Sequence, residues 1–287
     1  MTIYEFTVIS VHGYPYYNKI ITPIPAGVEV FLRFFDFSQK GSIPPQKEDV
    51  KFDLKAGLIS ALYNFSSQIN QKIDIVKFRS RKDKDQKENG IEPNYQGNVL
   101  MSVTTEPFLF HNQVRKKIEL IYEYFISSKV PLDEGNQLLF KEETEIVDIL
   151  MDVKAKDHLS AHYDEIEETA NRFLKEMKRY GLKAIVLTSL DLTPLLCFAP
   201  NKVFCLDDIV NILRNIGNIP DIDPLEWKYR QSLYNKQSMW VYLINSGIGI
   251  KVKGLFESYY YLLITEPNSY LGEFPKKLTS EFNDILS

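Results

Sequence analysis

The sequence predicts a fold of the α/β class, in its α+β form, built from two similar modules that follow one another along the chain. Three observations lead to this prediction. Short β-branched and aromatic segments alternate with amphipathic helical ones, a length of 287 residues suits two domains, and the second half repeats the order of the first. In each module we expect a strand, a strand, a helix, three strands and a helix.

The first half opens with a predicted hairpin. Residues 3–11 are β-branched and aromatic, and residues 16–21 form the returning strand after a turn that contains glycine and proline. The apolar run 28–37 predicts a further strand. It lies in an insert at 22–50, whose prolines interrupt both flanks of that strand.

Helix and strand signals alternate through the remainder of the first half. Apolar residues at three- and four-residue steps predict helices over 52–69 and 112–128. Runs of β-branched residues predict strands over 73–79 and 97–105. The charged, turn-rich stretch between these strands predicts a loop.

The second half begins after an acidic stretch. Residues 141–180 predict one helix or two, and Gly181 is the expected helix stop. Apolar periodicity then predicts helices over 206–216 and 270–286. The predicted strands of this half are 182–190, 195–199, 240–247, 248–256 and 258–265.

An internal repeat supports the two-module prediction. Residues 105–126 align with 265–286 without a gap, and both segments begin with Thr-Glu-Pro and carry a Lys-Lys pair. A weaker similarity joins 58–65 to 209–216. Chance similarity between two layered α and β structures is the alternative explanation.

Domain boundaries follow from this repeat. We place the first module at 1–140, including the insert, and the second at 181–287. Residues 141–180 either link the two modules or complete the first with C-terminal helices.

The element order resembles the longin/roadblock superfamily, which is profilin-like. The hairpins at 3–21 and 182–199, the helix expected after each, and the phrase GLISALYNFSSQI at 57–69 carry this resemblance. The last of these is similar to longin-like domains of archaeal trafficking-type proteins. The resemblance implies an antiparallel five-stranded sheet with flanking helices in each module.

The resemblance also implies a function. Members of this superfamily are typically scaffolds that dimerise and bind small Ras-like GTPases, and some act in nucleotide-exchange complexes. We therefore expect a non-enzymatic regulator in a vesicle-trafficking-like or signalling system that binds such a GTPase or a sister longin/roadblock subunit, and a homodimer is an open alternative. The expected contacts are Asn64, Ser67, Lys77, Arg79, Arg214 and Asn218.

Motifs of known chemistry are missing from the sequence. There is no GxxxxGK[ST] phosphate loop and no GxSxG nucleophile elbow. Gly247 and Gly249 predict a turn between strands rather than a phosphate-binding loop. His158 and His162 share a helix face, but two histidines do not make a metal site, and we expect a solvated face and no cofactor.

Two alternatives to the scaffold remain. An enzyme would need a pocket between the modules, lined by His12, His111 or the pair Glu106 and Glu266. A structural role for the two glutamates is favoured, because both precede proline at equivalent points of the repeat. The other alternative is a self-associating structural adaptor.

Charge and composition limit the partners and the location. A net charge of −4 gives no general reason to expect nucleic-acid binding. Two cysteines suit a reducing, cytoplasmic setting, and no run of residues is long and apolar enough to span a membrane. The basic stretch 77–88 could touch anionic lipid at a membrane periphery, although a solvated loop is favoured because its charges are mixed.

The run Tyr259-Tyr260-Tyr261 must alternate between the two faces of its strand. At least one of these tyrosines therefore faces away from its own core. It would belong either to a partner surface or to ordinary packing against the neighbouring module.

Overall fold

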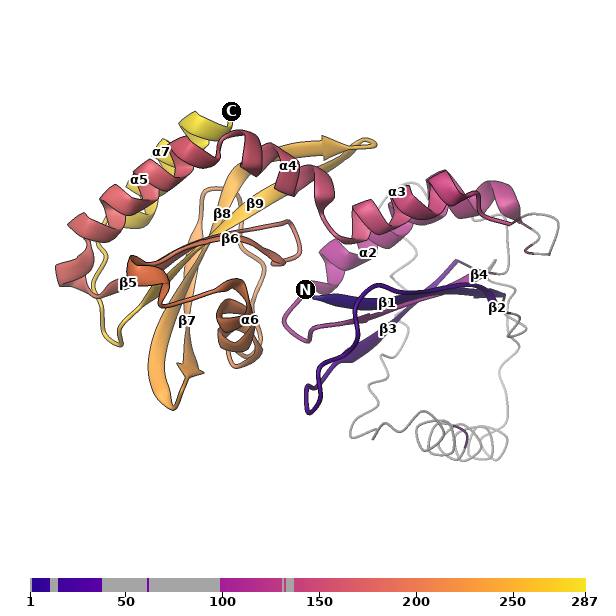
Figure 1. Ribbon diagram of the computed structural model, residues 1–287, viewed down its shortest axis with the longest axis horizontal. Coiled ribbons are helices and arrows are strands. Elements are labelled where there is room, and N and C mark those ends of the chain that lie inside the picture. The colour runs from indigo at the N-terminus through magenta and orange to yellow at the C-terminus, as the bar shows by residue number, and fades with distance from the viewer. Residues whose placement is uncertain (1, 11–14, 38–60, 62–98, 131, 133–136) are drawn as a thin grey trace. The chain divides into compact units, whose positions relative to one another are not determined.

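The computed structural model describes residues 2–10, 15–37, 61, 99–130, 132 and 137–287 (Figure 1). The helices and strands below all belong to one compact unit, formed by Met1–Ser38 and Gly97–Ser287. Within the described residues the protein is an α+β structure with two antiparallel sheets, of four and five strands, and six α-helices. The predicted fold class is confirmed at this level.

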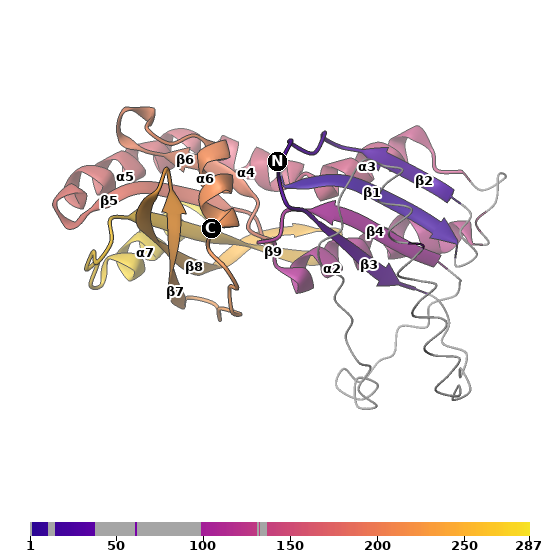
Figure 2. The same ribbon diagram turned by 90° about the horizontal axis from the view of Figure 1, so that it is seen from below.

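The first sheet has the strand order β2-β1-β4-β3 (Figure 2). Its strands are close to those that the sequence predicts. Burial alternates along β1 and β4, where the side chains of Phe6, Val8, Met101 and Val103 are fully buried while their neighbours are not. The strands are β1 (Ile3–Ser10), β2 (Pro15–Ile20), β3 (Phe31–Asp36) and β4 (Val99–Thr105).

Helix α2 (His111–Ile121) covers one face of this sheet. Val114, Ile118 and Ile121 are fully buried along one side of the helix, and the ring of His111 stacks on Phe35 of β3 at 5.6 Å. The helix continues as a π-turn over Tyr122–Ile126 and a 3₁₀ turn over Ser127–Lys129. The predicted helix at 112–128 is confirmed.

Three helices occupy the stretch in which the sequence predicts one or two. They are α3 (Phe140–Leu150), α4 (Val153–Ala161) and α5 (Tyr163–Glu176). The first break falls at Asp152, which has a left-handed backbone with φ 55° and cannot continue a helix. The stop predicted at Gly181 is confirmed, with φ 85°.

The second sheet has the order β6-β5-β9-β8-β7. The hairpin β5–β6, the strand β9 and the helices α6 (Leu206–Arg214) and α7 (Phe274–Leu286) follow the predictions. Strand β7 is missing from the sequence prediction. The strands are β5 (Leu182–Thr188), β6 (Pro194–Phe198), β7 (Trp227–Tyr234), β8 (Gln237–Val252) and β9 (Leu255–Thr265).

Strand β8 also corrects a prediction, because it replaces two predicted strands with one. The register against β9 shifts between Asn245 and Gly249, so the two glycines form a bulge inside a continuous strand and not a turn. Gly247 has φ 73°, and a Cβ on Gly249 would overlap the carbonyl oxygen of Glu257. Glycine is therefore required here by a backbone irregularity.

Helices cover both faces of the second sheet (Figures 1 and 2). On one face, α5 and α7 pack over a core that includes Phe173, Phe282 and Tyr261. On the opposite face, α6 packs through Ile209 and Leu213, both fully buried. The second sheet with α5, α6 and α7 is therefore a three-layer unit.

The run of three tyrosines is buried throughout. Tyr259 and Tyr261 belong to the core under α5 and α7, while Tyr260 points to the other face. There it lies 5.3 Å from the ring of Phe110, which precedes α2. Packing against the neighbouring module explains this tyrosine, and no partner surface is needed.

The internal repeat appears in the hydrogen-bond register of the two sheets. Each hairpin has an irregularity opposite its proline, Pro15 in β1–β2 and Pro194 in β5–β6. Each first strand has another irregularity near its start, where it faces Thr105 in one sheet and Thr265 in the other. Shared irregularities at matching positions support a repeated unit over chance similarity.

One pair of side chains at matching register positions differs in chemistry. Arg33 on β3 and Tyr242 on β8 occupy the same register position. The guanidinium of Arg33 donates to the carbonyl of Leu109 at 2.8 Å, and the hydroxyl of Tyr242 donates to the carbonyl of Ser269 at 2.9 Å. Both side chains hold the turn that follows Thr-Glu-Pro, with different chemistry.

The first module departs from the predicted order. Residues 21–30, which join β2 to β3, contain no helix, so β1, β2 and β3 follow one another, whereas the general module order has a helix after the hairpin. The sequence places the helix of this module at 52–69, after β3. The predicted helix at 52–69, residue 61 excepted, and the predicted strand at 73–79 lie outside the described residues. Strand β3 corresponds to β8 by register. Residues 58–65 follow β3 in the chain, whereas α6 precedes β8. The similar segments 58–65 and 209–216 therefore do not occupy equivalent places in the two halves. The domain limits 1–140 and 181–287 stay a prediction.

Candidate functional site

Four of the six predicted partner contacts lie outside the described residues; they are Asn64, Ser67, Lys77 and Arg79. The basic stretch 77–88 lies outside them too. The other two contacts flank the C-terminal end of α6. Arg214 is the last residue of that helix, and Asn218 is exposed in the connection to β7, where its carbonyl accepts a hydrogen bond from Arg230 at 3.3 Å.

Arg214 is already engaged within the chain. Its Nε and Nη2 donate to the two carboxylate oxygens of Glu106 at 2.9 and 2.6 Å, and Tyr4 also donates to Glu106. The Glu106 side chain is fully buried, whereas that of Arg214 is 24% exposed. A partner could meet only the exposed part of this guanidinium, so its role in partner binding stays a prediction.

The two repeat glutamates share a backbone position but not a side-chain role. The N–H of Glu106 donates to Thr2, and the N–H of Glu266 donates to Gly181, at 2.8 and 2.9 Å. The carboxylate of Glu266 is exposed and pairs with Lys183 at 2.5 Å. Their common role is to end a strand, β4 for Glu106 and β9 for Glu266, as the structural interpretation predicts.

An exposed aromatic strip lies on β7, which is the last strand of its sheet within the described residues. Trp227, Tyr229 and Leu233 are between 42% and 52% exposed, because they alternate along the strand and extend beyond the cover of α5 and α7. Tyr229 stacks on Trp240 of β8 at 5.0 Å. This arrangement combines an edge strand with large apolar side chains, which is typical of a protein-binding surface. Two outward carbonyls of this edge already accept hydrogen bonds within the chain, that of Tyr229 from Arg230 at 2.9 Å and that of Leu233 from Asn215 at 3.3 Å.

The hairpin turn beyond this strip is tightly defined. Asn235 and Lys236 form a two-residue connection with φ 49° and 64°, the geometry of a type I′ turn. The opposite side of β7 lies against α6, where the Ser232 hydroxyl donates to the carbonyl of Ile212 at 2.6 Å. The strip therefore sits on a rigid support.

A buried ionic cluster forms the second notable feature. The Lys117 Nζ lies 2.5 Å from an oxygen of Asp152 and 2.6 Å from an oxygen of Asp191, and all three side chains are fully buried. Asp191 also accepts hydrogen bonds from the hydroxyls of Ser189 and Thr193, at 2.8 Å each. The cluster joins α2, the α3–α4 break and the β5–β6 turn.

The pKa values of the two carboxyl groups in this cluster are shifted in opposite directions. Burial raises the pKa of Asp152 to about 6, although Lys117 partly opposes it. Burial also acts on Asp191, but Lys117 and the two hydroxyls outweigh it and hold its pKa below the ordinary value. The second oxygen of Asp152 has no hydrogen-bond partner among the described residues.

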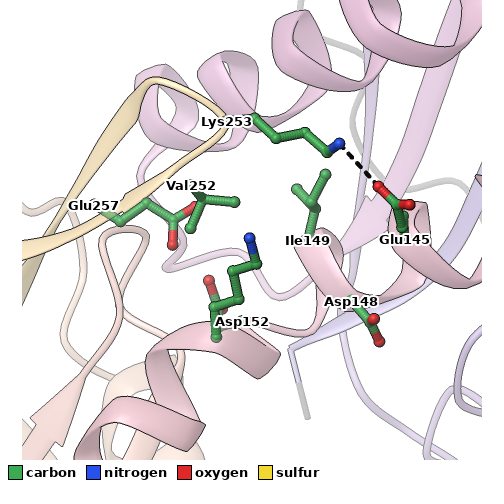
Figure 3. A pocket seen from close by; sticks show the side chains of 8 residues that line it. Glu145, Asp148, Ile149, Asp152, Val252, Lys253 and Glu257 are labelled. Carbon is green, nitrogen blue, oxygen red and sulfur yellow. Dashed lines mark ion pairs between the residues drawn. The ribbon is translucent and has the colours of Figure 1, made fainter.

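A cavity of about 280 Å³ lies beside this cluster (Figure 3). Its walls come from α3, from the α3–α4 break with the first turn of α4, and from the β8–β9 hairpin. The lining residues are Glu145, Asp148, Ile149, Asp152, Lys154, Val252, Lys253 and Glu257.

Glu257 is the notable side chain of this cavity. It is 4% exposed and makes no hydrogen bond or ion pair with any described residue. Burial raises its pKa to about 7, with Lys117 opposing and the carboxylates of Asp152 and Asp191 adding to the shift. A buried, unpaired carboxyl group at a cavity wall is a common mark of a functional site.

The histidines do not form a metal site in the part of the chain that the structure describes. His158 Nδ1 lies 2.9 Å from the hydroxyl of Tyr259, and its ring packs against His162 at 5.2 Å. No group of three or more His, Cys, Asp or Glu suited to a metal ion occurs among residues 2–10, 15–37, 99–130 and 137–287.

The cleft expected for an enzyme is not matched by the two cavities described here. Neither is lined by His111, Glu106 or Glu266, and His12 lies outside the described residues. The sequence interpretation did not identify the cluster of Lys117 with its carboxylates. The only signal was the repeated Lys-Lys pair, whose second member is Lys117.

Comparison with known proteins leaves the family open. No model of a protein family matches the chain, and no similar curated protein was found. Among the described residues, none of the helices combines the length and apolar character that a membrane crossing requires.

Proposed function

We propose that the chain is a non-enzymatic scaffold that binds a protein partner through α6 and the edge strand β7. The partner is a small Ras-like GTPase or a sister longin/roadblock subunit. The observation that carries this proposal is the strip of Trp227, Tyr229 and Leu233, which is exposed on the last strand of the sheet. Aromatic side chains of this kind commonly supply most of the binding energy at protein interfaces.

The fold supports the class of partner. The second sheet has five antiparallel strands, in the order β6-β5-β9-β8-β7, and flanking helices, which supports the proposed relation to longin/roadblock modules. The repeated register of the first sheet supports the tandem part of the resemblance.

The binding mode follows from the position of β7 at the edge of its sheet. A partner strand would displace the side chains of Arg230 and Asn215 from the outward carbonyls of Tyr229 and Leu233, and its own side chains would meet the aromatic strip. Contacts at the end of α6, next to Asn218, would extend that surface. A GTPase held there would have one conformation of its switch loops stabilised, which would shift its nucleotide equilibrium.

The experiment is biolayer interferometry against the small GTPases of the host, each presented as GDP-bound, GTP-analogue-bound and nucleotide-free. Tightest binding to the nucleotide-free form indicates an exchange factor, and preference for the analogue indicates an effector. Trp227→Ser should weaken binding by roughly 30-fold, which is about 2 kcal/mol. The matched control is Tyr270→Ser, because Tyr270 is 83% exposed outside the strip.

The result that contradicts this proposal is equal binding by the wild type and Trp227→Ser, with both proteins folded. Absence of binding across the panel would remove the GTPase and leave a sister subunit as the partner to test. Light scattering at increasing concentration tests the self-associating adaptor, since a constant monomer mass excludes it.

A further inference from the structure

The cavity at the α3–α4 break has more negative than positive charge around it. Its walls and the adjoining cluster carry the carboxyl groups of Glu145, Asp148, Asp152, Asp191 and Glu257, and the ammonium groups of Lys117, Lys154 and Lys253. The ionised set is therefore short of positive charge. Within this set Asp152, Asp191 and Glu257 are buried with a single buried ammonium group, that of Lys117, so a cation that enters beside them would offset their negative charge.

Two of the three ammonium groups are already engaged. Lys117 is held between Asp152 and Asp191. Lys253 pairs with Glu145 at 2.8 Å, as Figure 3 shows, and lies about 5 Å from the rings of Tyr124 and Phe125. Lys154 is exposed and forms no hydrogen bond with a described residue. Its positive charge partly offsets the negative charge of ionised Glu257, but its ammonium group donates no hydrogen bond to that carboxylate.

Two acceptors are left open at the cavity. One oxygen of Asp152 is fully buried without a hydrogen-bond partner in the described part of the chain. Glu257 is 4% exposed, and its carboxyl group lines the cavity. Buried acceptors of this kind are costly unless a donor meets them. Figure 3 shows both side chains at the cavity, one from the helix break and one from the hairpin.

The walls select the kind of cation. The apolar side chains of Ile149 and Val252 lie at the cavity, and both are at least 94% buried. No three acidic or histidine ligands suited to a metal ion come together among the described residues. A volume of about 280 Å³ suits a small organic group, and an alkyl chain with a charged end meets both kinds of wall.

We propose that this cavity binds an organic cation with an alkylammonium or guanidinium head, and that Glu257 and Asp152 are its counter-ions. The cation is either a free amine or the lysine or arginine side chain of a protein. The site goes beyond the proposed scaffold function, because neither α6 nor β7 contributes to it.

Binding should depend on pH in a stated direction. Glu257 faces Lys117 from α2, Asp152 from the helix break, Lys154 from α4 and Asp191 from the β5–β6 turn. Because its pKa is about 7, a rise in pH through neutrality ionises the carboxyl group that the cation needs. Affinity should therefore increase as the pH rises from 6 to 8, on the order of severalfold.

The test uses the full chain and calorimetric or NMR titration with four probes. Nα-acetyl-lysine methylamide and Nα-acetyl-arginine methylamide represent protein side chains, and butylamine represents a free amine. Nα-acetyl-norleucine methylamide is the neutral control of similar shape. We expect at least one cationic probe to bind and the neutral probe not to bind; which of the cations binds distinguishes the two sources.

Glu257→Gln should lower the affinity for the cationic probe by about tenfold or more. Glu168→Gln, the same chemical change on the exposed face of α5, should leave affinity unchanged. A thermal shift of the wild type by the cationic probe, and not by the norleucine probe, tests the site without any variant. Equal binding of the neutral probe, no binding of any cation, or full affinity in a folded Glu257→Gln would overturn the proposal.

Discussion

Substitution of Lys117 by methionine should destabilise the protein more than any other single change of a lysine in the described residues. Methionine keeps the length and the apolar stem of lysine but removes the charge. Asp152 and Asp191 then face each other without the ammonium that lies 2.5 and 2.6 Å from their oxygens. Both carboxyl groups are fully buried, and methionine offers them no hydrogen-bond donor in its place.

The expected size follows from removal of one member of a buried ionic cluster. Such a loss costs about 3–5 kcal/mol, because an uncompensated charge stays behind. A midpoint of about 4 kcal/mol is a large share of a typical stability of roughly 5–15 kcal/mol. For a chain of this size it corresponds to a fall in Tm of roughly 8–16 °C.

The assay is urea denaturation followed by circular dichroism, with a thermal scan beside it. Lys116→Met is the matched control, since Lys116 is the exposed neighbour on the same helix and should change stability by less than about 0.5 kcal/mol. The variant should also recover part of its stability as the pH falls, because protonation of Asp152 and Asp191 removes the repulsion. The triple variant Lys117→Met with Asp152→Asn and Asp191→Asn should regain much of the loss.

The reasoning fails if Lys117→Met is as stable as Lys116→Met at neutral pH. It also fails if the deficit of Lys117→Met grows as the pH is lowered, since that sign would mean that the carboxylates are not the source of the cost.

Further predictions concern the other buried groups. The pKa of Glu257 is raised from 4.5 to about 7, so the stability contributed by its protonated carboxyl group is complete below pH 4.5 and is lost as the pH rises to 7. Between these limits the free energy of unfolding of the wild type should fall by roughly 3 kcal/mol relative to that of Glu257→Gln. Urea titration at several pH values measures this difference. Glu106→Gln should cost about 1–3 kcal/mol by weakening the pair with Arg214, while the repeat-related and exposed Glu266→Gln should be nearly neutral in the same titration. Gly249→Ala should lower Tm by several degrees, since a Cβ would overlap a backbone oxygen; an unchanged Tm would mean that the bulge adapts.

Local patterns predicted most of the elements. Strands β1 to β4, the hairpin β5–β6, β9, and helices α2, α6 and α7 lie close to the ranges expected from burial periodicity. Strand β7 was missed although WKYR, at its start, alternates aromatic and charged residues as a half-exposed strand does. Strand β8 was divided because two glycines look like a turn when the bulge that they form is not known.

The candidate sites were less predictable, because their residues come together only in the fold. Lys117, Asp152 and Asp191 lie on three separate elements, and no spacing rule connects them. The Lys-Lys pair shows the limit of a repeat: Lys117 is buried between two carboxylates, while the equivalent Lys277 is exposed and pairs with Glu176 at 3.2 Å. Identical residues at equivalent positions can therefore have different environments.

The side-chain contacts between the two sheets benefit from the covalent connection of the two sheets in one chain. They include a few polar contacts, such as Arg214 with Glu106, Thr2 with Thr193 at 2.6 Å, and Lys117 with Asp191. For two separate polypeptides, association through such contacts would have to offset the lost translational and rotational freedom. Covalent connection gives each copy an effective concentration on the order of millimolar toward the other. A single chain therefore keeps the two sheets in equal numbers, and the side chains of one sheet always have the other sheet to pack against.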